Sequence, residues 1–331
     1  NLPYIFILCC FMGAFNMSFI SNDYINSIER GYGDSDKKLC HECIGNKSLK
    51  EYIKANGYVC TCDYCGQRRK AVNLDSFMVI IMSGVNFLYT HAVNELPCDS
   101  GEYIGKTYTT AQLIFEELRD EIDAQDERIL KDIVEIMYDD IWCDADPFSD
   151  REEDVAYYDW QSFCKMVKEK VRYVFYRATP DTSFNENPTT ILDTLAYYAE
   201  RVRLDRRIDK NTKMYRCRTH ENDEWRTAYA DFAPPPPWVA TSGRMNAAGI
   251  NVLYLTLDPN TALCETRTSG RDYATIASFR VTESIRVLDL TKIKKMSIPS
   301  IFDEDNRHNR SPVMFLQKFA ENISQPRSNK N

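Results

Sequence analysis

Residues 243–267 read GRMNAAGINVLYLTLDPNTALCETR and join a glycine-containing start, a short apolar run and a turn that opens a helix. The apolar run at 252–255 predicts a strand, because it is short and bounded by turn residues. The Asp-Pro-Asn turn at 258–260 marks the start of a predicted helix that contains Glu265. A strand, a tight turn and a helix that folds back can bring Tyr254 and Glu265 to one cleft. The segment therefore predicts a functional site.

The sequence on either side of this segment has the same mixed character. Residues 214–218 predict an early strand that carries Arg216, and residues 277–281 and 285–290 predict two further strands. Short strands mixed with short helices indicate an α+β domain, which we place at 211–331.

The chain before residue 211 has the apolar periodicity of helices, and we expect a helical domain over 71–210. Helices are predicted over 77–89, 110–122, 128–141, 159–176 and 189–207. The first of these could instead be a pair of strands, and Thr109 or Thr110 is the predicted N-cap of the second. Acidic residues and an Asp-Pro pair predict a loop over 143–158.

Four of the 12 cysteines form two CxxC pairs that are separated by 18 residues. These cysteines are Cys40, Cys43, Cys62 and Cys65. Two pairs at this spacing are typical of a structural zinc site, in which four thiolates close a tetrahedron and leave no position for water. Paired disulfides and free buried thiols are the alternatives, and Cys60 and His41 are spare donors that could replace one ligand. We predict a zinc ribbon over 39–70.

The composition is that of a folded globular protein, and it limits the classes of function. The 331 residues are enough for two domains, with 44% hydrophobic and 27% charged residues. A formal net charge of −8 argues against a dedicated nucleic-acid-binding protein, whose binding surface would be basic. We expect a cytoplasmic protein.

Both ends of the chain have unusual features. Residues 1–16 are mostly apolar, begin without Met and lack the basic start of a signal peptide. The run is also shorter than the ~20 residues of a membrane span. Within a leader at 1–38, we interpret residues 1–16 as upstream, non-native sequence before a natural start at Met17. A membrane-associating leader is the alternative. The final residues, ISQPRSNKN, predict an incomplete gene.

The motifs of the C-terminal part resemble the RES domain family, which is named for an arginine, a glutamate and a serine. The matching motifs, in order, are Tyr215-Arg216, Gly243-Arg244-x-Asn246, Gly249, Leu253-Tyr254-Leu255 and Ala262-Leu263-x-Glu265. The resemblance covers residues 212–327. The preceding region resembles the N-terminal domain that often accompanies RES, a CxxC ribbon joined to a HEPN-like helical bundle. It has no convincing Arg-x4–6-His pair of HEPN nucleases, so we expect a scaffold or dimerisation module rather than an RNase.

The resemblance implies an ADP-ribosyltransferase-like fold and a prokaryotic toxin that depletes NAD by phosphorolysis or hydrolysis. It further implies that a cognate antitoxin protein restrains the toxin, and that NAD and inorganic phosphate are the substrates. The residues that match the catalytic positions are Arg216, Tyr254 and Glu265, and the candidate cofactor-binding residues are Arg244, Gly243 and Asn246. The family's serine lies further along than this chain extends, so we expect the RES domain to be incomplete at its C-terminus.

Cleavage of the nicotinamide–ribose bond develops positive charge on the sugar, which the carboxylate of Glu265 would stabilise. The planar guanidinium of Arg216 suits a pyrophosphate or an attacking phosphate, and Tyr254 offers a flat face to nicotinamide. Taken alone, each of these residues is common in ordinary strands and helices, and only their joint order points to a site. An ADP-ribosyltransferase that modifies a macromolecule and a catalytically dead adaptor are the competing hypotheses.

Overall fold

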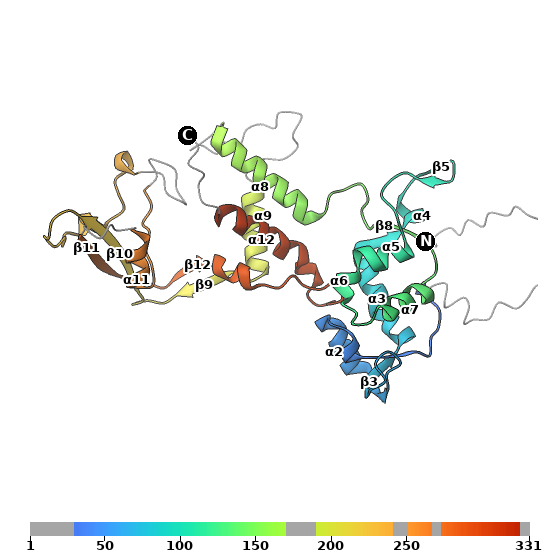
Figure 1. Cartoon of the computed structure of the whole chain (residues 1–331). Helices are drawn as coiled ribbons and strands as arrows, with labels where there is room; N and C mark the ends of the chain where they lie inside the picture. Colours follow the sequence, from blue (N-terminus) through green and yellow to red (C-terminus); the bar gives the residue numbers. More distant parts are fainter. Residues whose placement is uncertain (1–29, 170–189, 241–250, 267–272, 325–331) are drawn as a thin grey trace, which may run out of the picture. The chain divides into compact units, whose positions relative to one another are not determined.

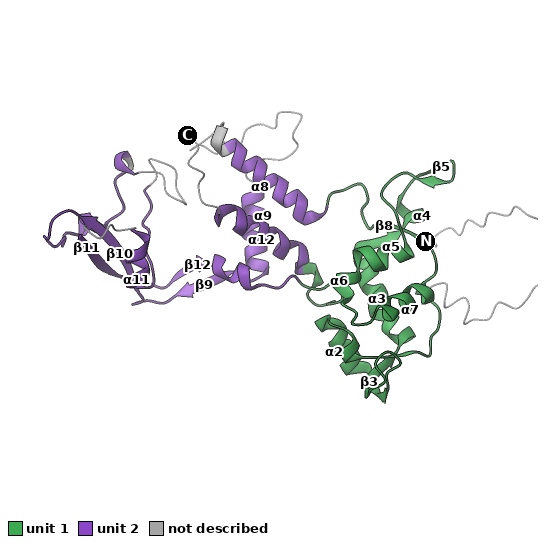
Figure 2. Ribbon diagram, viewed as in Figure 1, with its two compact units in different colours: residues 1–150, 299–308 green, residues 151–298, 309–331 purple. Residues whose placement is uncertain are grey.

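The protein divides into two compact units (Figure 2). Unit 1 comprises residues 1–150 and 299–308, and unit 2 comprises residues 151–298 and 309–331. The computed structural model describes residues 30–169, 190–240, 251–266 and 273–324 (Figure 1). The leader interpreted as upstream sequence, residues 1–16, lies outside these ranges. The chain has the mixed helix and strand content that the sequence predicts, whereas the domain boundaries expected after residues 38, 70 and 210 stay predictions.

The N-terminal part of unit 1 is a small antiparallel sheet with a helix. The strands lie in the order β1–β3–β2 and span Lys38–Cys40, Arg68–Asn73 and Tyr58–Thr61. The helix α2 (Lys47–Asn56) begins after Asn46, whose side-chain oxygen accepts a hydrogen bond from Leu49 N. This cap satisfies one of the N–H groups that the first helical turn leaves without a partner.

The helix α3 (Leu74–Leu88) lies at the centre of the unit 1 core. Phe77, Met78 and Ile81 on this helix are fully buried. The structure therefore confirms the helix predicted over 77–89 and excludes the pair of strands.

The predicted helix at 110–122 is present but interrupted. It consists of α5 (Thr110–Gln112), the π-helical turn η2 (Leu113–Glu117) and α6 (Arg119–Ile122). Thr109 is the N-cap, as predicted, and forms a reciprocal capping box with Gln112. The next helix, α7 (Glu127–Ile136), is capped by Asp126 and ends five residues before the predicted end at residue 141.

The reason for the earlier end is a strand that the sequence analysis missed. Strand β8 (Ile141–Asp144) pairs with β4 (Tyr89–His91) and β7 (Tyr108–Thr109), and it buries Trp142 and Cys143. The loop predicted over 143–158 is therefore wrong at its start. It is also wrong at its end, because a helix of unit 2 begins at Glu152. Short elements complete unit 1: α4 (Ala92–Glu95), β5 (Cys98–Asp99), β6 (Glu102–Tyr103) and the 3-10 turn η1 (His41–Cys43).

Residues 299–308 return from the C-terminal part of the chain and complete the core of unit 1; we call this segment the clasp. Ile301 and Phe302 are buried, with exposed fractions of 0% and 2%. The Phe302 ring lies so close to α3 that a Cβ atom on Gly84 would be 2.4 Å from it. Arg307 donates a hydrogen bond to the carbonyl of Ser83 at 2.8 Å and lies over the Phe87 ring.

The substitution Phe302→Ala is expected to destabilise unit 1 by about 3–5 kcal/mol, because it leaves a cavity against a helix that cannot collapse into it. Chemical denaturation of the purified protein measures this loss. The matched control is Phe148→Ala, since Phe148 is 72% exposed. A loss below about 1 kcal/mol for Phe302→Ala would show that the clasp is not part of the stable core.

The helices α8 (Glu152–Glu169), α9 (Thr190–Arg201) and α12 (Arg310–Ser324) pack together in unit 2. The rings of Trp160 and Phe319 meet edge to face, with their centroids 4.8 Å apart. The rings of Tyr198 and Phe315 meet in the same way, with their centroids 5.7 Å apart. The helix predicted over 189–207 is shorter than expected. Arg203 adopts a left-handed backbone with φ of 56°, which ends the helix and lets a strand begin at Asp205.

The remaining strands of unit 2 form two antiparallel sheets of two strands each. Strand β9 (Asp205–Ile208) pairs with β12 (Ile285–Leu288), and β10 (Lys213–His220) pairs with β11 (Tyr273–Arg280). The two ladders share one register, since Ile208 lies opposite Ile285 and Lys213 lies opposite Arg280. These strands confirm the predictions at 214–218, 277–281 and 285–290.

The strand predicted over 252–255 is wrong. The chain there has no regular structure, and only the following residue, Thr256, forms a bridge, to Tyr215. The helix predicted after it is present as α11 (Pro259–Glu265). The other short elements of unit 2 are α10 (Tyr229–Phe232), η3 (Pro237–Val239) and η4 (Leu290–Lys295), and η5 (Arg307–Asn309) precedes α12. Within the described ranges, no helix is both long enough and apolar enough to span a membrane.

Candidate functional site

The four cysteines of the two CxxC pairs come together in unit 1. Their sulfur atoms all lie within 4.8 Å of one another. Cys40 Sγ lies 3.6 Å from Cys43 Sγ and from Cys65 Sγ, and Cys43 Sγ lies 3.8 Å from Cys62 Sγ. Gly66 follows with a left-handed φ of 69°, so its lack of a side chain permits the tight turn after Cys65.

This geometry fits a metal ion with four thiolate ligands. Sulfurs at ~2.3 Å from a tetrahedral ion lie about 3.8 Å apart, which is close to the observed spacing. Burial raises the pKa of the Cys40 and Cys43 thiols above the ordinary value, so these groups need a bound cation to become thiolates. The predicted spare donors, Cys60 and His41, lie outside the cluster.

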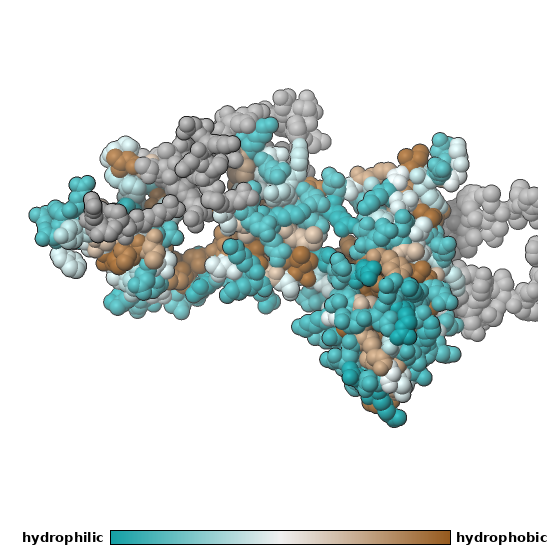
Figure 3. Space-filling model, viewed as in Figure 1, coloured by the Kyte–Doolittle hydropathy of each residue, from teal (hydrophilic) through white to brown (hydrophobic). Residues whose placement is uncertain are grey.

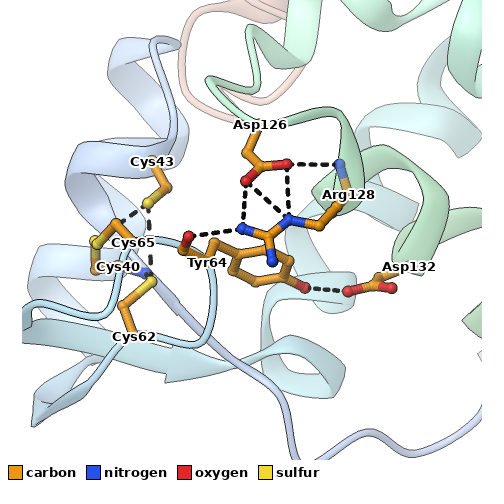
Figure 4. A network of polar contacts seen from close by, with 8 residues as sticks. All are labelled: Cys40, Cys43, Cys62, Tyr64, Cys65, Asp126, Arg128 and Asp132. Carbon is orange, nitrogen blue, oxygen red and sulfur yellow. Dashed lines mark hydrogen bonds and ion pairs between the residues drawn. The ribbon is translucent and has the colours of Figure 1, made fainter.

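The second knuckle of the cluster is attached to helix α7 through a polar network (Figure 4). The buried hydroxyl of Tyr64 donates a hydrogen bond to Asp132 Oδ2 at 2.7 Å, and Lys37 Nζ donates to the other oxygen at the same distance. Arg128 Nη2 donates to the Tyr64 carbonyl at 2.8 Å, and its guanidinium is held by Asp126. Burial, together with the Asp132 carboxylate, raises the pKa of Tyr64, so its hydroxyl stays a donor at neutral pH.

The substitution Tyr64→Phe is expected to destabilise unit 1 by about 1–3 kcal/mol, because it leaves one oxygen of Asp132 without its buried donor. Thermal unfolding of the metal-loaded protein measures the change, and metal content should stay the same. Tyr58→Phe is the control, since the Tyr58 hydroxyl contacts Asn73 at an exposed position. Equal melting temperatures for the two variants would contradict the proposed contribution of this network.

The predicted catalytic arginine, Arg216, lies in the middle of strand β10 and is only 8% exposed. Its Nη1 donates hydrogen bonds to the carbonyls of Phe232 and Ala233 at 3.0 and 3.2 Å. Burial lowers the pKa of Arg216, and the nearby charge of Arg218 lowers it further. In the described part of the chain, neither arginine has a carboxylate as an ion-pair partner.

The predicted glutamate, Glu265, is the last residue of α11 and is exposed. Asp258 caps this helix by accepting a hydrogen bond from Thr261 N at 2.7 Å, and Pro259 fixes its first turn. Tyr254 is 43% exposed and lies in the irregular segment before the helix. The Asp-Pro turn therefore has the predicted role of starting the helix that carries Glu265.

The described structure does not bring Arg216 and Glu265 onto one face of the strand. Successive side chains of a strand point to opposite faces, so Arg216 and Cys217 face opposite ways. Helix α11 packs on the Cys217 face, where the Thr266 hydroxyl lies 4.0 Å from Cys217 Sγ. Arg216 instead reaches the segment after α10. The predicted Gly243, Arg244 and Asn246 lie outside the described residues.

Sequence reasoning missed a row of polar residues on the Arg216 face of β10. Arg218 and His220 share this face because they follow at intervals of two. His220 is buried, with Nδ1 2.7 Å from the carbonyl of Asn222 and Nε2 2.9 Å from the hydroxyl of Thr275. A carbonyl only accepts, so Nδ1 donates to Asn222, and Nε2 is within hydrogen-bonding distance of the Thr275 hydroxyl. The alternation of basic residues at 216, 218 and 220 was the signal that could have identified this face.

A tetracysteine helical module is thus joined to an α+β module that carries an enclosed arginine and an exposed glutamate. Residues 55–181 match the family model of HEPN/RES N-terminal domain 1, and residues 213–328 match that of the RES domain. The chain therefore contains a HEPN/RES N-terminal domain followed by a RES domain, as its sequence motifs indicated. No curated protein and no solved structure matches the chain.

Proposed function

We propose that this protein is an NAD-consuming enzyme that cleaves the nicotinamide–ribose bond, with phosphate as the acceptor. The observation that carries this proposal is the RES domain match over residues 213–328, which includes Arg216, Tyr254 and Glu265. A RES domain is consistent with a family of NAD-related toxins. Identification of the reaction products distinguishes phosphate from water as the acceptor.

Glu265 is the residue that we assign to the reacting sugar. Departure of nicotinamide leaves positive charge on the ribose, and a carboxylate beside the hydroxyls stabilises that charge. The exposure of Glu265 and Tyr254 leaves both side chains accessible to a substrate. Nicotinamide is a cationic group while it is attached and leaves as a neutral molecule, so the reaction needs no strong general acid.

We assign the phosphate groups to the positive charge of strand β10. Arg216 and Arg218 lie two residues apart on one face, and an anion would balance charge that no described carboxylate balances. Arg216 also holds the carbonyls of Phe232 and Ala233, so we expect it to position the segment that leads to Trp238. We also propose cofactor contacts for Arg244, Gly243 and Asn246, on the family resemblance alone.

We further propose that the enzyme is the toxin of a toxin–antitoxin or anti-phage system, with a cognate antitoxin as its partner. Three aromatic side chains near α10 support a protein-binding surface. These are Trp225, Tyr229 and Trp238, which are 81%, 76% and 85% exposed. Aromatic residues are enriched in protein interfaces, and hydrophobic surface is visible over the β10–β11 part of unit 2 (Figure 3).

Zinc is the ion that we propose for the cysteine cluster of unit 1. The helical module is a candidate dimerisation surface.

The test is to incubate the protein with NAD, with and without inorganic phosphate, and to identify the products by phosphorus NMR. ADP-ribose 1″-phosphate that forms only with phosphate would establish a phosphorylase, and free ADP-ribose in both samples would establish a hydrolase. ADP-ribose attached to a macromolecule would favour the transferase hypothesis. Unchanged NAD in every sample would contradict the proposed function and favour the adaptor hypothesis.

A further inference from the structure

The clasp of unit 1 contacts the residue that follows the first cysteine pair. Asn46 lies three residues after Cys43 and caps helix α2 through its side-chain oxygen. The amide nitrogen of the same side chain donates to Ser300 Oγ of the clasp at 3.0 Å and to the carbonyl of Glu121 at 2.7 Å. One side chain therefore joins the metal-binding loop to the clasp.

The loop between Cys43 and Asn46 is itself held in place by backbone contacts. Gln125 N donates to the Cys43 carbonyl at 2.9 Å, and Gly45 N donates to the Asp123 carbonyl at 2.6 Å. A Cβ atom on Gly45 would lie 1.6 Å from the Asp123 side chain, so the two segments are in direct contact. Only two residues separate Cys43 from Asn46, so a displacement of Cys43 on loss of a metal ion would move Asn46.

The clasp has a second attachment to the same region. The Ile301 backbone N–H donates to Glu121 Oε1 at 3.1 Å, one residue after the Ser300 contact. The side chains of Ile301 and Phe302 then enter the core beside α3. Both attachments involve the Asn46–Glu121 region, so the start of the clasp is held next to the first metal-binding loop, whereas its later residues contact α3.

We propose that metal binding at the four cysteines and seating of the clasp are coupled through Asn46. The clasp lies within the residues that match the RES domain, although it is built into unit 1. Loss of the metal would release a segment of the RES domain from the N-terminal unit, and seating of the clasp would in turn strengthen metal binding. This inference rests on the proposed metal centre and is independent of NAD cleavage.

Hydrogen–deuterium exchange of the full chain tests the coupling. Metal content is determined first, and one sample is then depleted with excess chelator; Cys43 and Cys65 line a cavity of about 270 Å³. We expect exchange at 299–308 to become at least about tenfold faster on depletion, because the hydrogen bonds of Asn46 and Glu121 are lost. Exchange at α12, which belongs to unit 2, should stay unchanged.

The substitution Asn46→Ser separates this coupling from general unfolding. Serine keeps the helix cap but lacks the amide donor. The metal-loaded variant should exchange faster at 299–308 while residues 40–65 stay protected. Lys47→Ala is the matched control, since Lys47 is exposed and contacts Glu51.

Metal removal that speeds exchange at 40–65 and leaves 299–308 unchanged would overturn the coupling and leave the metal centre intact. An Asn46→Ser variant that exchanges like the wild type at 299–308 would also overturn it. A chain that binds no metal would remove the premise, and the metal analysis distinguishes this failure from the other two.

Discussion

Replacement of Cys62 by serine is expected to abolish metal binding and to unfold the ribbon part of unit 1. Cys62 is 1% exposed and lies 3.8 Å from Cys43 across the cluster. A structural zinc ion contributes about 10–16 kcal/mol of apparent binding free energy in small zinc domains, which exceeds the net stability of many whole domains. The three remaining thiols cannot close the tetrahedron, so most of this contribution would be lost.

The measurement is metal content by mass spectrometry, followed by thermal unfolding of the same sample. Cys60→Ser is the control, because Cys60 lies two residues earlier, is half-buried and is not one of the clustered cysteines. We expect one metal ion per chain and an unchanged transition for this control. A Cys62→Ser protein that keeps one bound ion and its melting temperature would refute the proposed ligand set.

The substitution Glu265→Gln is expected to slow NAD consumption by about 10²–10³-fold, with little change in KM. The amide keeps the size of the side chain and loses the charge that stabilises the transition state, and one such electrostatic contact is worth about 3–4 kcal/mol. Loss of rate without loss of binding is the signature of an interaction that forms in the transition state.

Release of nicotinamide over time gives the rates of the wild type and the variant. Glu283→Gln is the control, since Glu283 is also an exposed acid of unit 2. Rates for Glu265→Gln within twofold of the wild type would exclude Glu265 as a catalytic residue. The unfolding temperatures of the two variants should agree, because both side chains lie at the surface.

The features that local sequence determines were predictable. The CxxC spacing identified the four clustered cysteines, and the apolar run before residue 89 identified α3. The Asp258–Pro259 pair identified the start of α11. In each case the physical cause lies within a few residues, whether it is a knuckle, a buried helix or an N-cap.

The features that depend on distant residues were not predictable. The π-helical turn at Leu113–Glu117 keeps an apolar spacing that resembles an ordinary helix. Strand β8 forms because Trp142 and Cys143 meet partners from β4 and β7. The order of motifs placed Arg216 before Glu265, but it could not say on which face of β10 the helix α11 would pack.

The clasp also determines when unit 1 can finish folding during synthesis. Ser83 and Glu304 form a hydrogen bond across 221 positions of the chain, so α3 leaves the ribosome long before its partner segment exists. At the synthesis rate of about 5–20 residues per second, the surface around Gly84 stays open for on the order of ten seconds or more. The newly made N-terminal unit therefore carries an unfilled apolar groove until most of the RES domain has been translated. Completion of the first unit in the sequence becomes a late event of biosynthesis, and a chaperone has that interval in which to bind.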